Sequence, residues 1–158
     1  MVSNLRALLV SCLMLSPLAF AGVEPAPAPQ KPLNAEANYL LRCMGCHDRD
    51  GTGLPAAGIP DFNNYVGSFA ATDNARAYLM HVPGVIGSSL TDGEIASVMN
   101  YIMKRWGGIS LADDFRPFSA AEVATLRQRD VGDVVKFRRT VVTELKAQSL
   151  PVAEYPWP

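Results

Sequence analysis

The run that decides the fold lies at residues 43–47 and joins two cysteines to a histidine: Cys43-Met44-Gly45-Cys46-His47. The segment before it opens with Asn34, a residue type that caps helices, and places apolar side chains at helical spacing. The segment after it, 48–64, is rich in glycine and proline, which is typical of loops. We therefore expect a helix that leads directly into the motif and a long loop that follows it.

The spacing C-x-x-C-H is the attachment signature of c-type haem. Two thiols separated by two residues can each add to one vinyl group of the same porphyrin, and the adjacent histidine is then held under the iron. Cys43 and Cys46 are therefore the candidates for covalent attachment of one haem c, and His47 for an axial iron ligand. A thioredoxin-like redox pair, half of a zinc site and a small disulfide loop are the competing interpretations. They are weaker because no strand is predicted and no other cysteine remains in the mature chain.

The first 21 residues have the features of a secretory signal peptide: a basic start, an apolar run and the sequence Ala19-Phe20-Ala21. Cleavage after Ala21 would export the chain to the periplasm and remove Cys12, the odd one of the three cysteines. A competing interpretation takes Leu9-Val10-Ser11-Cys12 as a lipobox, with a lipid anchor on Cys12. The mature chain has no apolar run long enough for a transmembrane helix.

The remainder divides into three parts. Residues 22–33 alternate proline with small residues and predict an extended linker. Residues 34–108 form the domain around the motif, with further helices expected at 72–81 and from Asp92 to Trp106. Residues 109–158 predict a helical C-terminal extension of unknown role. Because the pattern contains no convincing strand, the expected fold class is all-α.

Two possible capping boxes mark helix starts in these parts. Thr91 and Glu94 form the first, ahead of an apolar stripe on one helix face, and Ser119 and Glu122 form the second. A further amphipathic helix is expected around 134–145. Its polar face has four basic residues, which could steer an acidic partner: Lys136, Arg138, Arg139 and Lys146.

With these features in place, residues 34–108 resemble a small monohaem cytochrome c of class I. The resemblance rests on the first helix and its motif, the glycines Gly51 and Gly53 just after it, and the last helix that Thr91 opens. It implies that the first and last helices cross at one edge of the haem, which would set Tyr39 or Leu40 against the stripe of the last helix. It does not extend to residues 109–158.

The sixth position of the iron is the open point of this interpretation. Cytochromes that only transfer electrons usually fill it with methionine or histidine. His81 is the one histidine besides His47 and precedes a Val-Pro-Gly turn, which in the family is a common place for the distal ligand. Met80 is the alternative, and Met103 is a less favoured one. An iron with both His47 and His81 as ligands would have a lower reduction potential than one with His47 and Met80.

These features predict a periplasmic carrier of single electrons, not an enzyme, that docks with redox partners such as a dehydrogenase, an oxidase or another cytochrome. The formal net charge of −1 gives no basic surface for nucleic acid. Two alternatives stay open: a haem-binding subunit of a larger redox complex, and a haem enzyme or gas sensor with an open sixth position. The porphyrin is also expected to complete a core that is small for its length, with Leu54 and Phe62 among the residues around it.

Overall fold

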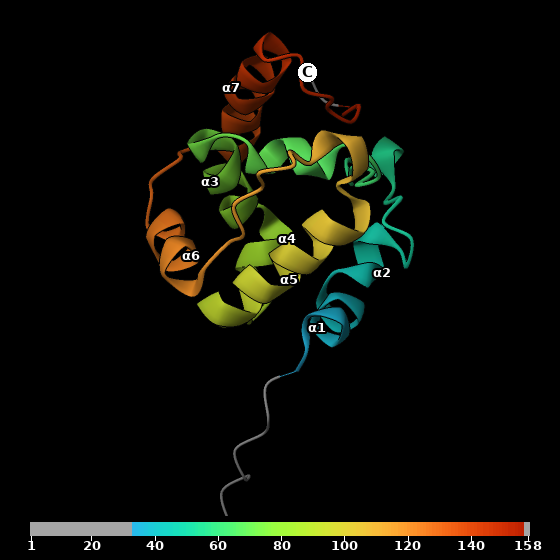
Figure 1. Ribbon diagram of the computed structural model, residues 1–158, viewed down its shortest axis with the longest axis vertical. Coiled ribbons are helices and arrows are strands. Elements are labelled where there is room, and N and C mark those ends of the chain that lie inside the picture. Colours follow the sequence, from blue (N-terminus) through green and yellow to red (C-terminus); the bar gives the residue numbers. More distant parts are fainter. Residues whose placement is uncertain (1–32, 157–158) are drawn as a thin grey trace, which may run out of the picture. The chain divides into compact units, whose positions relative to one another are not determined.

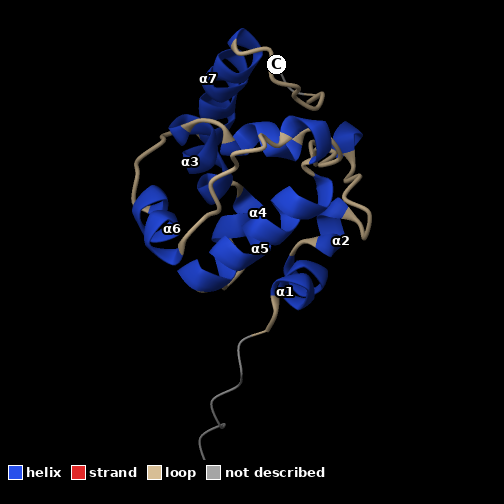
Figure 2. Cartoon of the chain, viewed as in Figure 1, coloured by secondary structure: helices blue, strands red, loops and turns tan. Residues whose placement is uncertain are grey.

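A computed structural model of the chain describes residues 33–156, which fall within one compact unit, Lys31–Pro158. The predicted signal peptide, Cys12 and the predicted linker up to residue 32 lie outside the described residues. Within the described part all regular structure is helical apart from an isolated bridge between Leu54 and Ile59, so the all-α prediction is confirmed (Figure 2). None of the described helices has the length and apolar character needed to cross a membrane.

The first half of the unit contains two α-helices and two short 3-10 helices: α1 (Ala35–Arg42), α2 (Met44–His47), η1 (Pro55–Ala57) and η2 (Val66–Ala70). As predicted, the side chain of Asn34 caps α1, because its Oδ1 accepts a hydrogen bond of 2.8 Å from the N–H of Ala37. Cys43 joins α1 to α2, so the motif continues the first helix with a single residue between the two.

The middle of the unit consists of α3 (Asp73–His81), α4 (Pro83–Ile86) and α5 (Asp92–Trp106). The predicted helix at 72–81 is confirmed, with Thr72 as its cap. The predicted stop after it is also present, but Pro83 then starts the short helix α4, which the sequence analysis missed. Proline is tolerated at the first position of a helix because the N–H that it lacks would have no intrahelical acceptor there. Val82-Pro83 therefore ends one helix and begins another.

The capping box of α5 is confirmed: the Thr91 N–H donates to Glu94 Oε2 over 2.9 Å, and the Glu94 N–H donates to Thr91 Oγ1 over 3.3 Å. Figure 1 shows α5 crossing the middle of the unit, with α1 and α2 on one side and α6 on the other. Every residue of its predicted apolar stripe is buried: Ile95, Val98, Met99, Ile102 and Trp106.

The crossing of the first and last helices of the motif-bearing part is held by aromatic side chains. The Tyr39 ring lies 4.6 Å from that of Trp106 and 5.8 Å from that of Tyr101, measured between ring centroids. The Tyr39 hydroxyl donates a hydrogen bond to Asp48 O, just beyond α2. Burial raises the pKa of this hydroxyl well above its usual value, which keeps it a donor. The expected contact of Tyr39 with the stripe is therefore confirmed for Trp106.

The C-terminal part of the unit contains η3 (Gly108–Ser110), α6 (Ala120–Arg127) and α7 (Val134–Ala147). α6 packs against α3 and α5, and α7 packs against α3. Four side chains of this region join the central apolar cluster: Phe118, Val123, Val141 and Leu145. The end of the chain returns to η2, where Ser68 Oγ donates to Pro151 O over 2.6 Å.

Two expectations in this region were wrong. Ser119 caps α6, but Glu122 does not complete a capping box, because its carboxylate accepts hydrogen bonds of 2.7 Å from both Nε and Nη2 of Arg76. Arg138 is not on the solvent face of α7. It is only 7% exposed, with its guanidinium 3.9 Å from the centroid of the Tyr155 ring. A long-range partner outweighed the local pattern in both cases.

Candidate functional site

The motif forms a single helical turn. The N–H groups of Cys46 and His47 both donate to Cys43 O, over 3.1 and 3.0 Å, so the two thiols and the imidazole project from one turn of backbone. Both cysteines are free. The structure therefore does not support the interpretation of the motif as a small disulfide loop.

The two thiols differ in their surroundings. Cys46 is exposed, whereas Cys43 is half-buried, and burial together with the nearby Cys46 raises the pKa of the Cys43 thiol to about 11. The outer side of the turn is open, because a Cβ atom added at Gly45 would meet no heavy atom within 4 Å. A planar group bonded to both sulfurs would therefore meet no obstruction at Gly45.

His47 is held as a neutral imidazole. Burial lowers its pKa to about 4, and the carbonyl of Pro60 only partly opposes this shift. Its Nδ1 is buried and has no hydrogen bond of ordinary geometry within the described residues. A neutral ring keeps a nitrogen lone pair at neutral pH, which is the form that binds a metal.

The chain after the motif folds back onto His47. The Gly53 N–H donates to His47 O over 3.1 Å, and the Phe62 N–H donates to Gly51 O over 2.8 Å. The Phe62 ring then stacks on the His47 ring, with centroids 3.9 Å apart and planes 17° apart. One residue after Gly53, the side chain of Leu54 is 56% exposed, so an apolar group lies at the surface beside this fold-back.

These features fit a covalently attached haem: two free thiols and a neutral imidazole in one turn, an open outer side and an exposed apolar neighbour. Cys43 and Cys46 would hold the porphyrin and His47 would be the axial ligand. Elsewhere in the described range, no group of three or more His, Cys, Asp or Glu side chains is placed to hold a metal ion.

His81, the favoured candidate for the sixth position, lies at the end of α3. Its Nδ1 is 2.8 Å from Ala77 O, and because a carbonyl can only accept, the neutral tautomer that fits this contact has its proton on Nδ1 and its lone pair on Nε2. The residue is partly exposed and lines a shallow, mainly apolar groove together with residues in and just after α4 and around the start of α7: Pro83, Ile86, Gly87, Val131, Gly132 and Val134.

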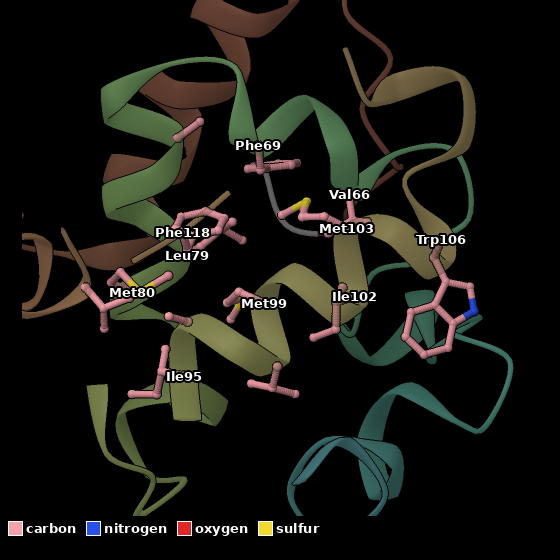
Figure 3. Close-up of a cluster of buried hydrophobic side chains, with 14 of the residues drawn as sticks. Val66, Phe69, Leu79, Met80, Ile95, Met99, Ile102, Met103, Trp106 and Phe118 are labelled. Atoms are coloured by element: carbon pink, nitrogen blue, oxygen red, sulfur yellow. The ribbon is translucent and has the colours of Figure 1, made fainter. Parts of the chain in front are cut away.

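The methionine candidates lie inside the apolar cluster. Met80 from α3 and Met103 from α5 are both fully buried, and Met99 is nearly so. Figure 3 shows all three within the same cluster as Leu79, Phe118 and Val66. The turn at 43–47 thus brings Cys43, Cys46 and His47 together, while the candidates for the sixth position come from two other helices.

Sequence reasoning missed how His47 is packed. Phe62 was expected near the haem and Trp106 in the helix stripe. Nothing in the local sequence indicated that the Phe62 ring stacks on His47. Gly51 has a φ of +80°, which allows this fold-back. A glycine in the sequence permits a positive φ but does not show that the backbone adopts one.

The chain is similar to cytochrome c-552 of Thermus thermophilus, with 33% identity over 111 residues that cover 59% of this chain and 84% of that protein. A second cytochrome c-552, from a named strain of the same organism, is also 33% identical over 111 residues, which cover 74% of its length. No protein-family model matches the chain.

Proposed function

Because the chain belongs to the c-type cytochromes, which carry covalently bound haem c and transfer electrons, we propose that it is a monohaem carrier of single electrons outside the cytoplasm. The observation that carries this proposal is the turn at 43–47, where two free thiols and a neutral, half-buried imidazole project from the same backbone segment. We propose one haem per chain because this is the only C-x-x-C-H run in the sequence.

Each residue of the turn has a distinct role in this proposal. Cys43 and Cys46 form thioether bonds, which prevent loss of the group, and His47 provides an axial nitrogen. When bound, haem c supplies an iron that alternates between the ferric and ferrous states. The protein's contribution is to hold the His47 ring in a fixed position against Phe62, so that little has to move when the charge changes.

For the sixth position we propose His81, with Met80 as the alternative and Met103 as a less favoured one. The support is the tautomer of His81, since a hydrogen bond from Nδ1 to a backbone carbonyl is the usual companion of a ligating Nε2. Met80 and Met103 are buried in the cluster of Figure 3, so each would have to leave an apolar contact in order to bind iron.

We further propose that residues 1–21 are a signal peptide cleaved after about Ala21, that 22–33 are a linker, and that 34–108 carry the haem. Residues 109–158 are then a C-terminal extension, and the partners are redox proteins such as a dehydrogenase, an oxidase or another cytochrome. The mass of the secreted protein tests the cleavage site: cleavage after Ala21 gives a first residue of Gly22, whereas a lipid on Cys12 gives a heavier, membrane-bound chain.

The haem proposal is tested on the protein secreted from a host with haem-attachment machinery. We expect a denaturing gel to show haem fluorescence or peroxidase staining on the wild-type chain, and a pyridine haemochrome assay to give one haem per chain. Replacing both thiols (Cys43→Ala with Cys46→Ala) should abolish covalent haem and yield an unfolded or degraded chain. A wild-type chain without covalent haem would contradict the proposal.

The sixth ligand is tested by the near-infrared and EPR spectra of the ferric protein, with His81→Ala and Met80→Leu as matched variants. We expect His81→Ala to convert the spectrum to that of an iron with an open or water-filled position, and to allow carbon monoxide to bind the ferrous form rapidly. Met80→Leu should leave both unchanged. The reverse result would assign Met80, and no change in either variant would leave Met103 or an open site.

A further inference from the structure

We propose that Phe62 is a positioning residue for the axial histidine: its ring fixes the plane of the His47 imidazole and keeps water from one face of it. This inference rests on the proposed role of His47 and adds a residue outside the motif to the electron-transfer site. The direct observation is the stacked pair, with ring centroids 3.9 Å apart and planes 17° apart.

A stack this close and this parallel covers one face of the imidazole. The two rings together have only a narrow range of mutual rotation, because turning either ring toward the perpendicular would drive its edge into the other at this separation. His47 is also attached through its own backbone, since the Gly53 N–H donates to His47 O over 3.1 Å. The backbone of His47 is therefore held by the loop that follows the motif, and its imidazole is held by an aromatic plane on one face.

Phe62 is itself held in place. Its N–H donates to Gly51 O over 2.8 Å, and its carbonyl accepts from the N–H groups of Tyr65 and Val66, both over 3.0 Å. Its ring centroid lies 6.0 Å from that of Trp106, and Trp106 in turn fills the space beside Gly51, where a Cβ would lie 2.8 Å from the indole Nε1. The stacked ring thus belongs to a packed layer and not to a mobile loop end.

This arrangement has a consequence for the electron-transfer site. An aromatic ring over one face of the axial histidine keeps water from that face, which disfavours the oxidised state, because its extra positive charge would be better solvated if water reached the ring. Removing the Phe62 ring should therefore lower the reduction potential. It should also free the imidazole plane, and the plane of an axial histidine determines the pattern of haem methyl shifts in the NMR spectrum of a ferric protein.

The test uses the secreted holoprotein and the variant Phe62→Leu, with Phe62→Tyr as the conservative variant and Phe115→Leu as the matched control. Phe115 is also a half-buried phenylalanine in the same cluster, but its ring partner is Phe118, at 6.4 Å. For Phe62→Leu we expect a lower reduction potential and a changed order or spread of the haem methyl shifts. Phe62→Tyr should restore both, and Phe115→Leu should change neither.

The proposal is overturned if Phe62→Leu lowers the melting temperature as Phe115→Leu does but leaves the potential and the methyl shifts at their wild-type values. If Phe62→Leu does not accumulate, Phe62→Met keeps the volume without a ring, and the same two shifts are expected from it; wild-type values in Phe62→Met would equally overturn the proposal. Failure of the underlying function is distinguishable, since the wild-type chain would then contain no covalent haem.

Discussion

Gly51, four residues after His47, combines two constraints in one residue. Its φ of +80° lies in the left-handed region, and a Cβ at this position would lie 2.8 to 2.9 Å from atoms of the Trp106 indole. Side chains rarely adopt such a φ, and the indole is fixed by its contacts with Tyr39 and Phe62. The turn after the motif can therefore close onto the aromatic layer only with glycine at this position.

We expect Gly51→Ala to destabilise the holoprotein by about 2–4 kcal/mol, from backbone strain and overpacking together. The measurement is the free energy of unfolding from a denaturant titration. Gly84→Ala in α4 is the matched control, because its added Cβ meets nothing within 4 Å and its φ is not positive, so a change within about 1 kcal/mol is expected. Equal effects of the two substitutions would contradict this account of Gly51.

At the scale of elements, α3 and α6 are tied by a buried ion pair. Arg76 on α3 is 2% exposed, and its guanidinium makes two hydrogen bonds of 2.7 Å with Glu122 on α6 and lies 3.7 Å from the centroid of the Phe118 ring. Its Nη1 donates further to the carbonyls of Ala70 and Arg116. These partners stabilise the fold, because burying a guanidinium without partners costs on the order of 3–5 kcal/mol of folding free energy.

Glu122→Gln should therefore destabilise the protein by about 3–5 kcal/mol, because Arg76 would keep its charge in a buried site without a compensating carboxylate. The matched control is Asp92→Asn, which removes the pair of Asp92 with Arg127, where both side chains are more than a third exposed. An exposed pair contributes at most about 1 kcal/mol. Thermal or denaturant unfolding of the two variants measures the contrast, and similar losses would argue against a special role for Arg76.

The same ion pair predicts a dependence of stability on pH. Burial tends to raise the pKa of Glu122, but the hydrogen bonds from Arg76 and Arg116 outweigh it and hold the pKa below the usual value. The unfolded chain then binds a proton more readily, so stability from this group is full above the ordinary carboxyl pKa and is lost as pH falls through the folded pKa. We expect the wild type to lose more stability than Glu122→Gln between about pH 6 and about pH 3. Parallel losses would contradict this.

The elements that could be predicted are those whose signals are local. Asn34 and Thr91 cap their helices through residues three positions away, and the stripe of α5 is buried because its spacing is purely helical. Glu122 has the same local signal as Glu94, yet its carboxylate binds a guanidinium 46 residues earlier. Arg138 looked like a solvated basic residue for the same reason: the Tyr155 ring that covers it lies beyond the end of α7.

At the scale of the whole molecule, residues 109–156 share their core with the motif-bearing part. Phe118, Val123, Val141 and Leu145 belong to the same buried cluster as Tyr39 and Met103. The composition of the C-terminal part indicated helices but not where they pack, since amphipathic spacing shows which face is apolar and leaves the partner face unspecified. Likewise the motif predicts the three groups of the candidate site, but only the fold shows the stack of Phe62 on His47.

We expect truncation after Gly108 to abolish cooperative unfolding, since it removes the four side chains that this part contributes to the apolar cluster, and the loss of each costs about 2–5 kcal/mol. In the full-length holoprotein, haem absorbance and far-UV circular dichroism should report the same unfolding midpoint, because one probe lies at α2 and the other includes α6 and α7. A truncated holoprotein that unfolds with the full-length midpoint would contradict this expectation.

The hydrogen bond from Ser68 to Pro151 also bears on the order in which the parts of the chain fold. It closes a loop of 83 residues, and pairings between such distant positions form late, after the local helices. Cys43 and Cys46 precede Pro151 by 108 and 105 residues, so both thiols are synthesised before the segment that closes this loop. We therefore expect both thiols to be available for haem attachment before the C-terminal residues complete the core.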